Sequence, residues 1–223
     1  IDHPHQWILK YACNISSEDM LVINENFVIG NLAERFACEM LSENIKKKDI
    51  NNFIDNRQKI ILKEQAAFFN ETHRGEDKEL FLSNIKRALQ KLHDFVAINK
   101  LAPPTHSGIK MFQSKLSSKR NSNIDLFGFS DLIMMKGDIP VVIDFKYTSS
   151  SKNRYENDMK EGRDIQLILY YEMLKYKLQA EHVLSAYFML NNGNCYCIES
   201  DSNLLFGTIP VQVGNVESSN AKD

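Results

Sequence analysis

At 223 residues with 43% hydrophobic content, the chain is long enough to bury one substantial core, or one core with a helical appendage. Its formal net charge of −2, from 27 Lys and Arg against 29 Asp and Glu, does not by itself indicate a nucleic-acid-binding protein. No apolar run approaches the roughly 20 residues that a membrane span requires. We therefore expect a soluble chain without a membrane partner.

The cysteines and the first residue of the chain bear on the cellular environment and on the length of the natural polypeptide. The four cysteines are scattered, and no window resembles a secretory signal, which indicates a reducing environment. We expect a cytoplasmic protein. Because the first residue is Ile1 rather than Met, we also expect residues 1–223 to be a single domain taken from a longer polypeptide.

The front half of the chain carries a helical periodicity. Residues 29–45 place apolar side chains at spacings of three and four, which predicts an amphipathic helix. Further helices are expected at about residues 53–69 and 78–100. This mostly helical part, over about residues 29–100, ends before the pair Pro103-Pro104, because proline lacks a backbone donor and disfavours helix in its predecessor.

Beyond the prolines the pattern becomes that of strands. Short segments rich in branched and aromatic residues predict strands at about residues 109–115, 124–135, 141–147, 183–190 and 195–199. A helix is expected between the third and fourth strands, at about residues 159–178. The element order predicts an α/β fold, with its sheet and helix over about residues 109–199.

Two aspartates interrupt apolar strands. Asp131 follows Gly128-Phe129-Ser130 in one predicted strand, and Asp144 lies in Val-Val-Ile-Asp-Phe-Lys in the next. An ionised group in a buried strand is costly unless it is paired or binds a cation. Magnesium prefers oxygen ligands and commonly takes only one or two carboxylates. The two aspartates therefore predict a shared divalent-ion site.

Lys146 lies two residues after Asp144, so alternation along a strand places both side chains on one face. A cation beside a metal site can orient the attacking water or neutralise charge on a phosphate during hydrolysis. The alternative is a structural ion pair of Asp144 with Lys146, with Asp131 capping a turn. The spacing alone leaves both interpretations open.

Gln166 and Tyr170 are four residues apart in the predicted late helix, which places them on one helical face. There an amide and a phenol can meet a phosphate or a base. A tyrosine in such a helix is also a common core residue, and this alternative stays open.

The ordered set Gly30-x-x-x-Glu34, Gly128-x-x-Asp131, Asp144-x-Lys146 and Gln166-x-x-x-Tyr170 resembles the PD-(D/E)xK nuclease superfamily. The similarity is to its RecB-type branch, which includes AddB-like repair nucleases and CRISPR-associated exonucleases. It runs from about residue 29 to residue 188. The resemblance implies a restriction-endonuclease-like core, a mixed sheet flanked by helices.

The resemblance also implies roles for individual residues. Asp131 and Asp144 correspond to metal ligands, Lys146 to the catalytic lysine, and Gln166 with Tyr170 to a late motif that contacts DNA. The implied cofactor is Mg²⁺ or Mn²⁺, as one or two ions.

One position departs from the RecB-type pattern, because Glu34 stands where many members carry histidine. Glutamate is a competent oxygen ligand for magnesium or manganese, so we expect Glu34 to be a third metal ligand and part of the catalytic set. The alternative is a solvated helix residue in a member that has lost activity.

Some relatives carry an iron–sulfur cluster on one early and three late cysteines. Here Cys13 is early, but Cys195-x-Cys197 lacks a third late partner. We therefore expect no iron–sulfur cluster.

Basic residues are concentrated locally. Residues 110–160 hold nine Lys or Arg against six Asp or Glu, so the rest of the chain is acidic. We expect this segment to follow a DNA backbone, with Lys152 and Arg154 as substrate-binding residues. The other basic residues that we expect to contribute are Lys110, Lys115, Lys119 and Arg120.

Together these features predict a metal-dependent deoxyribonuclease with DNA as its partner, an exonuclease rather than an endonuclease, from a repair, recombination or defence protein. An adjoining helicase-like region or protein partner is implied by resemblance. A nuclease fold that binds or scaffolds DNA without cutting, and an interaction domain without nucleic acid, stay open as alternatives. The oligomeric state is not predicted.

Overall fold

The computed structural model describes residues 25–106, 109–121, 124–148, 157 and 166–211, without the side chains of residues 67 and 118–127. The helices are α2 (Glu25–Ser42), α3 (Ile50–Gln65), α4 (Gly75–Ile98), α6 (Gln166–Leu178) and α7 (Glu199–Ser202), with short 3₁₀ turns η3 (Lys47–Asp49) and η4 (Ala67–Asn70). The strands are β1 (Phe112–Asn121), β2 (Ile124–Lys136), β3 (Ile139–Lys146), β4 (Leu184–Met189), β5 (Cys195–Ile198) and β6 (Ile209–Val211).

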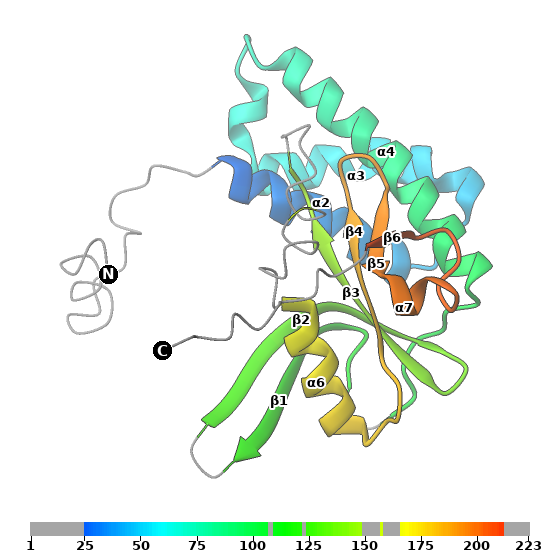
Figure 1. The fold of residues 1–223 in the computed structure, drawn as a ribbon. Helices are drawn as coiled ribbons and strands as arrows, with labels where there is room; N and C mark the ends of the chain where they lie inside the picture. The colour runs from blue at the N-terminus through cyan, green and yellow to red at the C-terminus, as the bar shows by residue number, and fades with distance from the viewer. Residues whose placement is uncertain (1–24, 107–108, 122–123, 149–156, 158–165, 212–223) are drawn as a thin grey trace, which may run out of the picture.

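The strands form one mixed sheet in the order β1-β2-β3-β4-β5-β6 (Figure 1). The first three are antiparallel neighbours, β3 and β4 are parallel, β4 and β5 antiparallel, and β5 and β6 parallel. Parallel neighbours need a long crossover, and α6 lies within the one that joins β3 to β4. The expected fold, a mixed sheet flanked by helices behind a helical front half, is confirmed.

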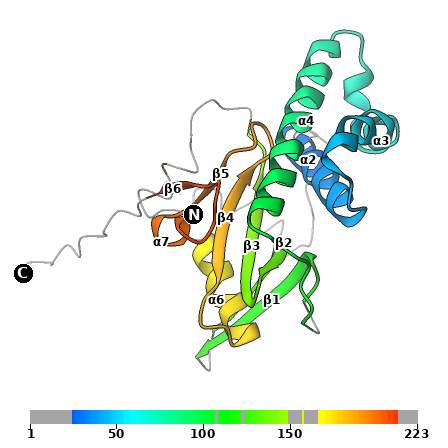
Figure 2. The ribbon, with the colours of Figure 1, turned by 90° about the vertical axis from the view of Figure 1, so that its right-hand side faces the viewer.

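Helices cover the two faces of the sheet unequally. On one face, α2 and α4 bury their apolar sides in the main core with Leu132, Ile143 and Phe188, and α3 packs on these two helices. On the other face, α6 packs in a smaller core with Ile133 and Val142. Figure 2 shows the three helices on one side of the strands and α6 on the other. No helix in the described segments has the length and apolar character needed to cross a bilayer.

The helix and strand predictions hold, with shifts at the ends. The first strand was expected at residues 109–115 but spans Phe112–Asn121, because its later part is polar and reads as loop in the sequence. β6 and α7 were not predicted, since elements of three and four residues carry too little periodicity. The late helix is described from Gln166, and residues 159–165 of its prediction lie outside the described residues.

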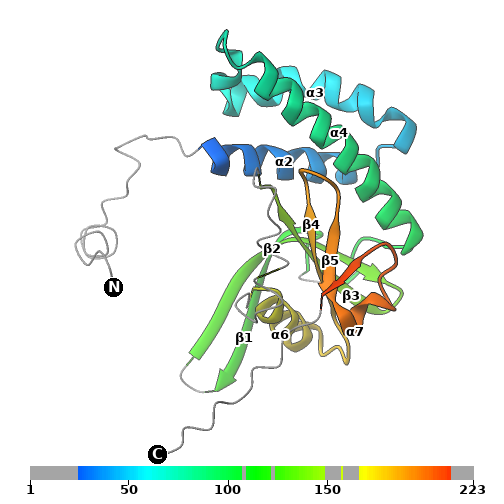
Figure 3. The same cartoon turned by 45° about the horizontal axis from the view of Figure 1, so that its top comes forward.

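The long β1–β2 hairpin changes faces partway along its length. Phe112 packs against the main core, whereas Leu116 packs against α6. Positions four apart in a regular strand share a face, so the backbone must turn between them. It does so at Gln113, whose φ of 46° is left-handed. We call residues 113–121 and 124–131 the hairpin arm, which projects beside α6 and away from α2–α4 (Figure 3).

The arm and α6 are in close contact at Gly128. A Cβ atom on Gly128 would lie 3.2 Å from Met173 Cε and 3.5 Å from Tyr170 Cε1. Both side chains belong to α6. The glycine three residues before Asp131 therefore lets the helix pack directly on the strand that carries this aspartate.

Candidate active site

The two aspartates of the sequence motifs lie where the pairing of β2 with β3 ends. The last pair of this ladder is Leu132 with Ile143, and Asp131 and Asp144 are the next residue of each strand beyond it. There the Asp131 carboxylate accepts a hydrogen bond from the Phe145 backbone of β3. The end of the ladder therefore brings the two aspartate-bearing segments together.

Asp144 is buried and paired with a lysine. Its carboxylate Oδ2 lies 2.6 Å from Lys146 Nζ, with the two side chains 2% and 17% exposed. Both residues come from β3 and are separated by Phe145 alone, which points to the opposite core. The predicted common face of Asp144 and Lys146 is confirmed. This face looks toward α6.

The first residue of α6 bridges this ion pair. Gln166 Nε2 donates to Asp144 Oδ1 at 3.0 Å, and Lys146 Nζ donates to Gln166 Oε1 at 2.9 Å. Gln166 Nε2 also lies 2.9 Å from the Tyr170 hydroxyl, and that hydroxyl donates to the Phe129 carbonyl at 2.8 Å. The predicted pairing of Gln166 with Tyr170 on one helical face is confirmed, and it links β2, β3 and α6.

Burial raises the pKa of the Tyr170 phenol to about 12, although its hydrogen bond with Gln166 acts in the other direction. The hydroxyl therefore stays protonated at neutral pH and can donate to the Phe129 carbonyl. Tyr170 is buried, at 7% exposure, and packs against Met173 and Leu174. It is both a core residue and a support for Gln166.

Asp131 is held from the side by the neighbouring strand. Its Oδ2 accepts a hydrogen bond of 2.7 Å from the Phe145 backbone N–H. Burial and the negative charge of Glu34 raise the pKa of Asp131 to about 6, against the lowering effects of that hydrogen bond and of Lys146. The Asp131 carboxyl is therefore poised between its neutral and ionised forms near the lower end of the physiological pH range.

Glu34 reaches the same site from α2. Burial and the nearby Asp144 carboxylate raise its pKa, while hydrogen bonding from the Gln113 side chain and the charge of Lys146 lower it. The main core packs α2 against β3 through Leu32, Phe36 and Ile143. Packing between elements that are distant in the chain thus brings the third predicted carboxylate close enough to interact with the two aspartates.

The donor chemistry of this site fits a divalent cation. Three carboxylates interact there, and each of Glu34 and Asp131 has its pKa raised by another member. A bound cation would relieve this repulsion. The described residues contain no cluster of three or more His, Cys, Asp or Glu side chains in position to hold a metal. Asp131 and Asp144, completed by water and substrate oxygen atoms, are sufficient for magnesium.

Two residues near this site were not singled out from the sequence. Gln113 faces Glu34 from a left-handed backbone position, for which its sequence neighbours give no signal. Cys38 lies four residues after Glu34 on α2, and the spacing could have identified it. Burial and the charges of Glu34 and Asp131 raise the pKa of the Cys38 thiol to about 12, so this thiol stays protonated at neutral pH.

The predicted basic residues are only partly placed. Lys110 and Lys115 are exposed. Lys152 and Arg154 lie outside the described residues, as do the side chains of Lys119 and Arg120. Cys13, considered for an iron–sulfur cluster, is also outside. Of the late cysteines, Cys195 is buried, and the Cys197 thiol donates a hydrogen bond to Thr208 Oγ1 at 3.1 Å.

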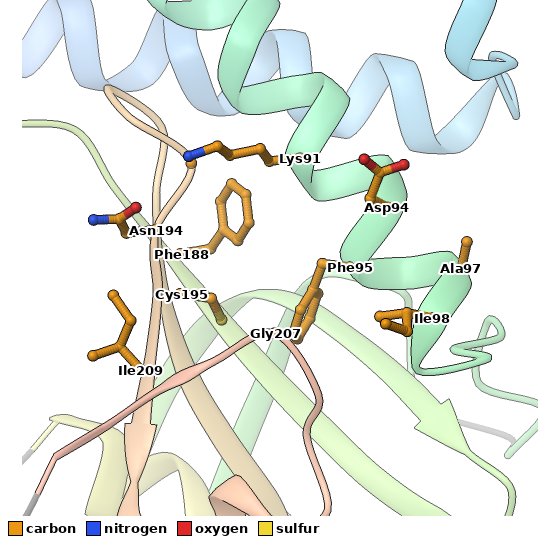
Figure 4. A pocket seen from close by; sticks show the side chains of 11 residues that line it. Lys91, Asp94, Phe95, Ala97, Ile98, Phe188, Asn194, Cys195, Gly207 and Ile209 are labelled. Atoms are coloured by element: carbon orange, nitrogen blue, oxygen red, sulfur yellow. The ribbon is translucent and has the colours of Figure 1, made fainter.

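A separate pocket of about 580 Å³ lies between α4 and the strands β4 and β5 (Figure 4). Phe95 of α4 and Phe188 of β4 line it, with Lys91 and Asp94 on the helix side. Its lining includes none of the carboxylates or their partners described above. The chemistry indicated by the sequence therefore belongs to the site of Asp131 and Asp144 and not to this pocket.

Comparison with known proteins agrees with the geometry. The sequence profile of the PD-(D/E)XK nuclease superfamily matches residues 4–200, most of the chain and all of the elements that form the site. A search of curated proteins finds no significant match. Nucleases of this superfamily generally use divalent metal ions.

Proposed function

Because the chain belongs to the PD-(D/E)XK nuclease superfamily, we propose that it is a metal-dependent deoxyribonuclease whose site comprises Asp131, Asp144, Lys146 and Glu34. The observation that carries this proposal is the bridging of Asp144 and Lys146 by Gln166. A structural ion pair needs no third group from another element. A catalytic site needs such a group, because it must hold a carboxylate and an ammonium in fixed orientations.

Each residue of the site has a chemical task in this proposal. Asp131 and Asp144, with Glu34 beside them, would hold Mg²⁺ or Mn²⁺, which on binding polarises the phosphorus and lowers the pKa of the attacking water. The Lys146 ammonium neutralises negative charge that develops on the phosphate oxygens. Gln166 orients Asp144 and Lys146, and Tyr170 fixes Gln166 against the Phe129 carbonyl.

The resemblance to RecB-type nucleases supports a finer proposal. On that basis the chain is an exonuclease in DNA repair, recombination or defence, and it works beside a helicase-like region or partner. We propose that residues 1–223 form one nuclease domain. The basic residues Lys152 and Arg154 would contact the DNA backbone.

The experiment that tests this function is cleavage of linear and circular DNA, single- and double-stranded, with Mg²⁺ or Mn²⁺. Wild type is compared with Asp144→Ala and Lys146→Ala, and with Asp138→Ala as a matched control at an exposed aspartate between β2 and β3. We expect cutting by wild type and the control alone. Cleavage of linear but not circular DNA identifies an exonuclease. If no protein cuts but DNA binds, the domain is a binding module.

A further inference from the structure

Phe129 is an exposed aromatic residue within a paired strand. It lies in β2 opposite Lys115 of β1, and it is 56% exposed. Exposing a large apolar ring costs free energy that burial would recover. Its neighbours in the same hairpin arm are buried, with Leu116 0% exposed and Ser130 1% exposed.

The exposure follows from how α6 covers the arm. The helix packs on the face that carries Ser114, Leu116 and Gly128. Lys115 and Phe129 alternate with these residues and therefore occupy the opposite face. We call this the open face of the arm, defined by Lys115 and Phe129. Both side chains are exposed.

Phe129 is close to the active site along the chain. Phe129 lies two residues before Asp131 on the same strand, a span of roughly 7 Å. Its carbonyl accepts the hydrogen bond from Tyr170, so the network that positions Gln166 also fixes the backbone of Phe129. The backbone that carries the exposed ring is therefore tied to the residues of the proposed site.

We propose that the open face binds an unpaired DNA strand, with Phe129 stacking on a base beside the reacting phosphate and Lys115 contacting the backbone. Every base offers a π-face to an aromatic ring, and lysine supplies the complementary charge for phosphate. Within a duplex each base is already stacked on its neighbours, so the ring is available only to a single strand or a frayed end. This inference rests on the proposed function and names its substrate class.

The test separates binding from cutting. Asp144→Asn serves as a background in which cleavage is silenced, and the anisotropy of a labelled oligonucleotide reports binding. Adding Phe129→Ala should weaken binding of a single strand by roughly five- to a hundredfold, whereas Phe129→Trp should preserve it. Binding of the corresponding blunt duplex should change less than about twofold. Lys115→Gln should weaken single-strand binding and reduce its salt dependence.

Phe206→Ala is the matched control, because this aromatic residue is 53% exposed and lies beside Lys136, at the opposite end of β2 from the hairpin arm. It should leave single-strand binding unchanged. If Phe129→Ala weakens binding of single strand and duplex equally, or weakens neither, the inference is overturned and the proposed nuclease function stands. Absence of cleavage by the protein with native Asp144, together with Phe129-dependent single-strand binding, overturns the nuclease function alone. Absence of any DNA binding overturns both.

Discussion

Lys146 Nζ lies 2.6 Å from Asp144 Oδ2, so a carboxylate that is almost fully buried has its counter-charge two residues away on the same strand. Removal of one member of a buried ion pair leaves the other without compensation, which costs far more than the pair itself contributes. The two residues are therefore coupled in stability as well as in the proposed chemistry.

Lys146→Met should lower the free energy of unfolding by roughly 2 to 4 kcal/mol without divalent ions. Mg²⁺ or Mn²⁺ should restore part of this loss, because a bound cation replaces the missing charge beside Asp144. Urea unfolding with and without the ion measures both effects. The double variant Asp144→Asn with Lys146→Met should be more stable than Lys146→Met alone. Equal response of both variants to the ion would contradict binding at Asp144.

Asp131→Asn should stabilise the metal-free protein at neutral pH by roughly 1 to 3 kcal/mol. The pKa of Asp131 is raised from its ordinary 3.8 to about 6. Folding therefore favours the neutral form of Asp131. The stability that this carboxyl contributes is complete below pH 4 and is lost as the pH rises through 6. Asparagine retains an oxygen to accept from the Phe145 N–H.

Urea unfolding of Asp131→Asn and wild type should give equal stability near pH 3.5 and a difference that grows up to pH 7. Asp138→Asn, on the exposed turn of the same hairpin, should show no such trend. For the same reason the activity of the wild type should decline below about pH 6, because protons then compete with the metal ion for the Asp131 carboxylate. A constant difference across the pH range would contradict the assigned pKa.

Tyr170→Phe should lower kcat with a smaller change in KM. Loss of the hydroxyl removes its hydrogen bonds to Gln166 and to the Phe129 carbonyl. The expected loss of stability is about 1 kcal/mol. Tyr176→Phe changes an exposed tyrosine of the same helix and is the control. Indistinguishable kinetics of the two variants would show that Tyr170 acts only through packing.

Gln113→Val should destabilise the protein by roughly 1 to 2 kcal/mol, because a side chain branched at Cβ clashes in the left-handed region. Gln113→Gly should retain stability, since glycine adopts this conformation without strain. Both variants remove the hydrogen-bond partner of Glu34, and both should show reduced activity. Equal unfolding free energies for the two variants would show that the backbone relaxes elsewhere.

Local patterns in the sequence were sufficient for the elements and for part of the site. Alternation along β3 predicted the common face of Asp144 and Lys146, and helical spacing predicted the pairing of Gln166 with Tyr170. Both relationships depend on residues two or four positions apart, where secondary structure fixes side-chain direction. The sequence by itself also determined the hairpin that carries Asp131 and Asp144, through its two apolar segments and their turn.

Only the tertiary structure decided what lies around this pair. Glu34 reaches Asp131 and Asp144 because α2 packs on the sheet, and no local periodicity encodes the geometry of that packing. The left-handed backbone at Gln113 reverses which face of the sheet the side chains of β1 occupy. Simple alternation along β1 therefore assigns Phe112 and Leu116 to one face, although they lie on opposite faces. The exposure of Phe129 follows from that reversal and from the limited area that α6 covers. Side-chain direction is a local property, whereas neighbours and exposure depend on contacts between segments far apart in the chain.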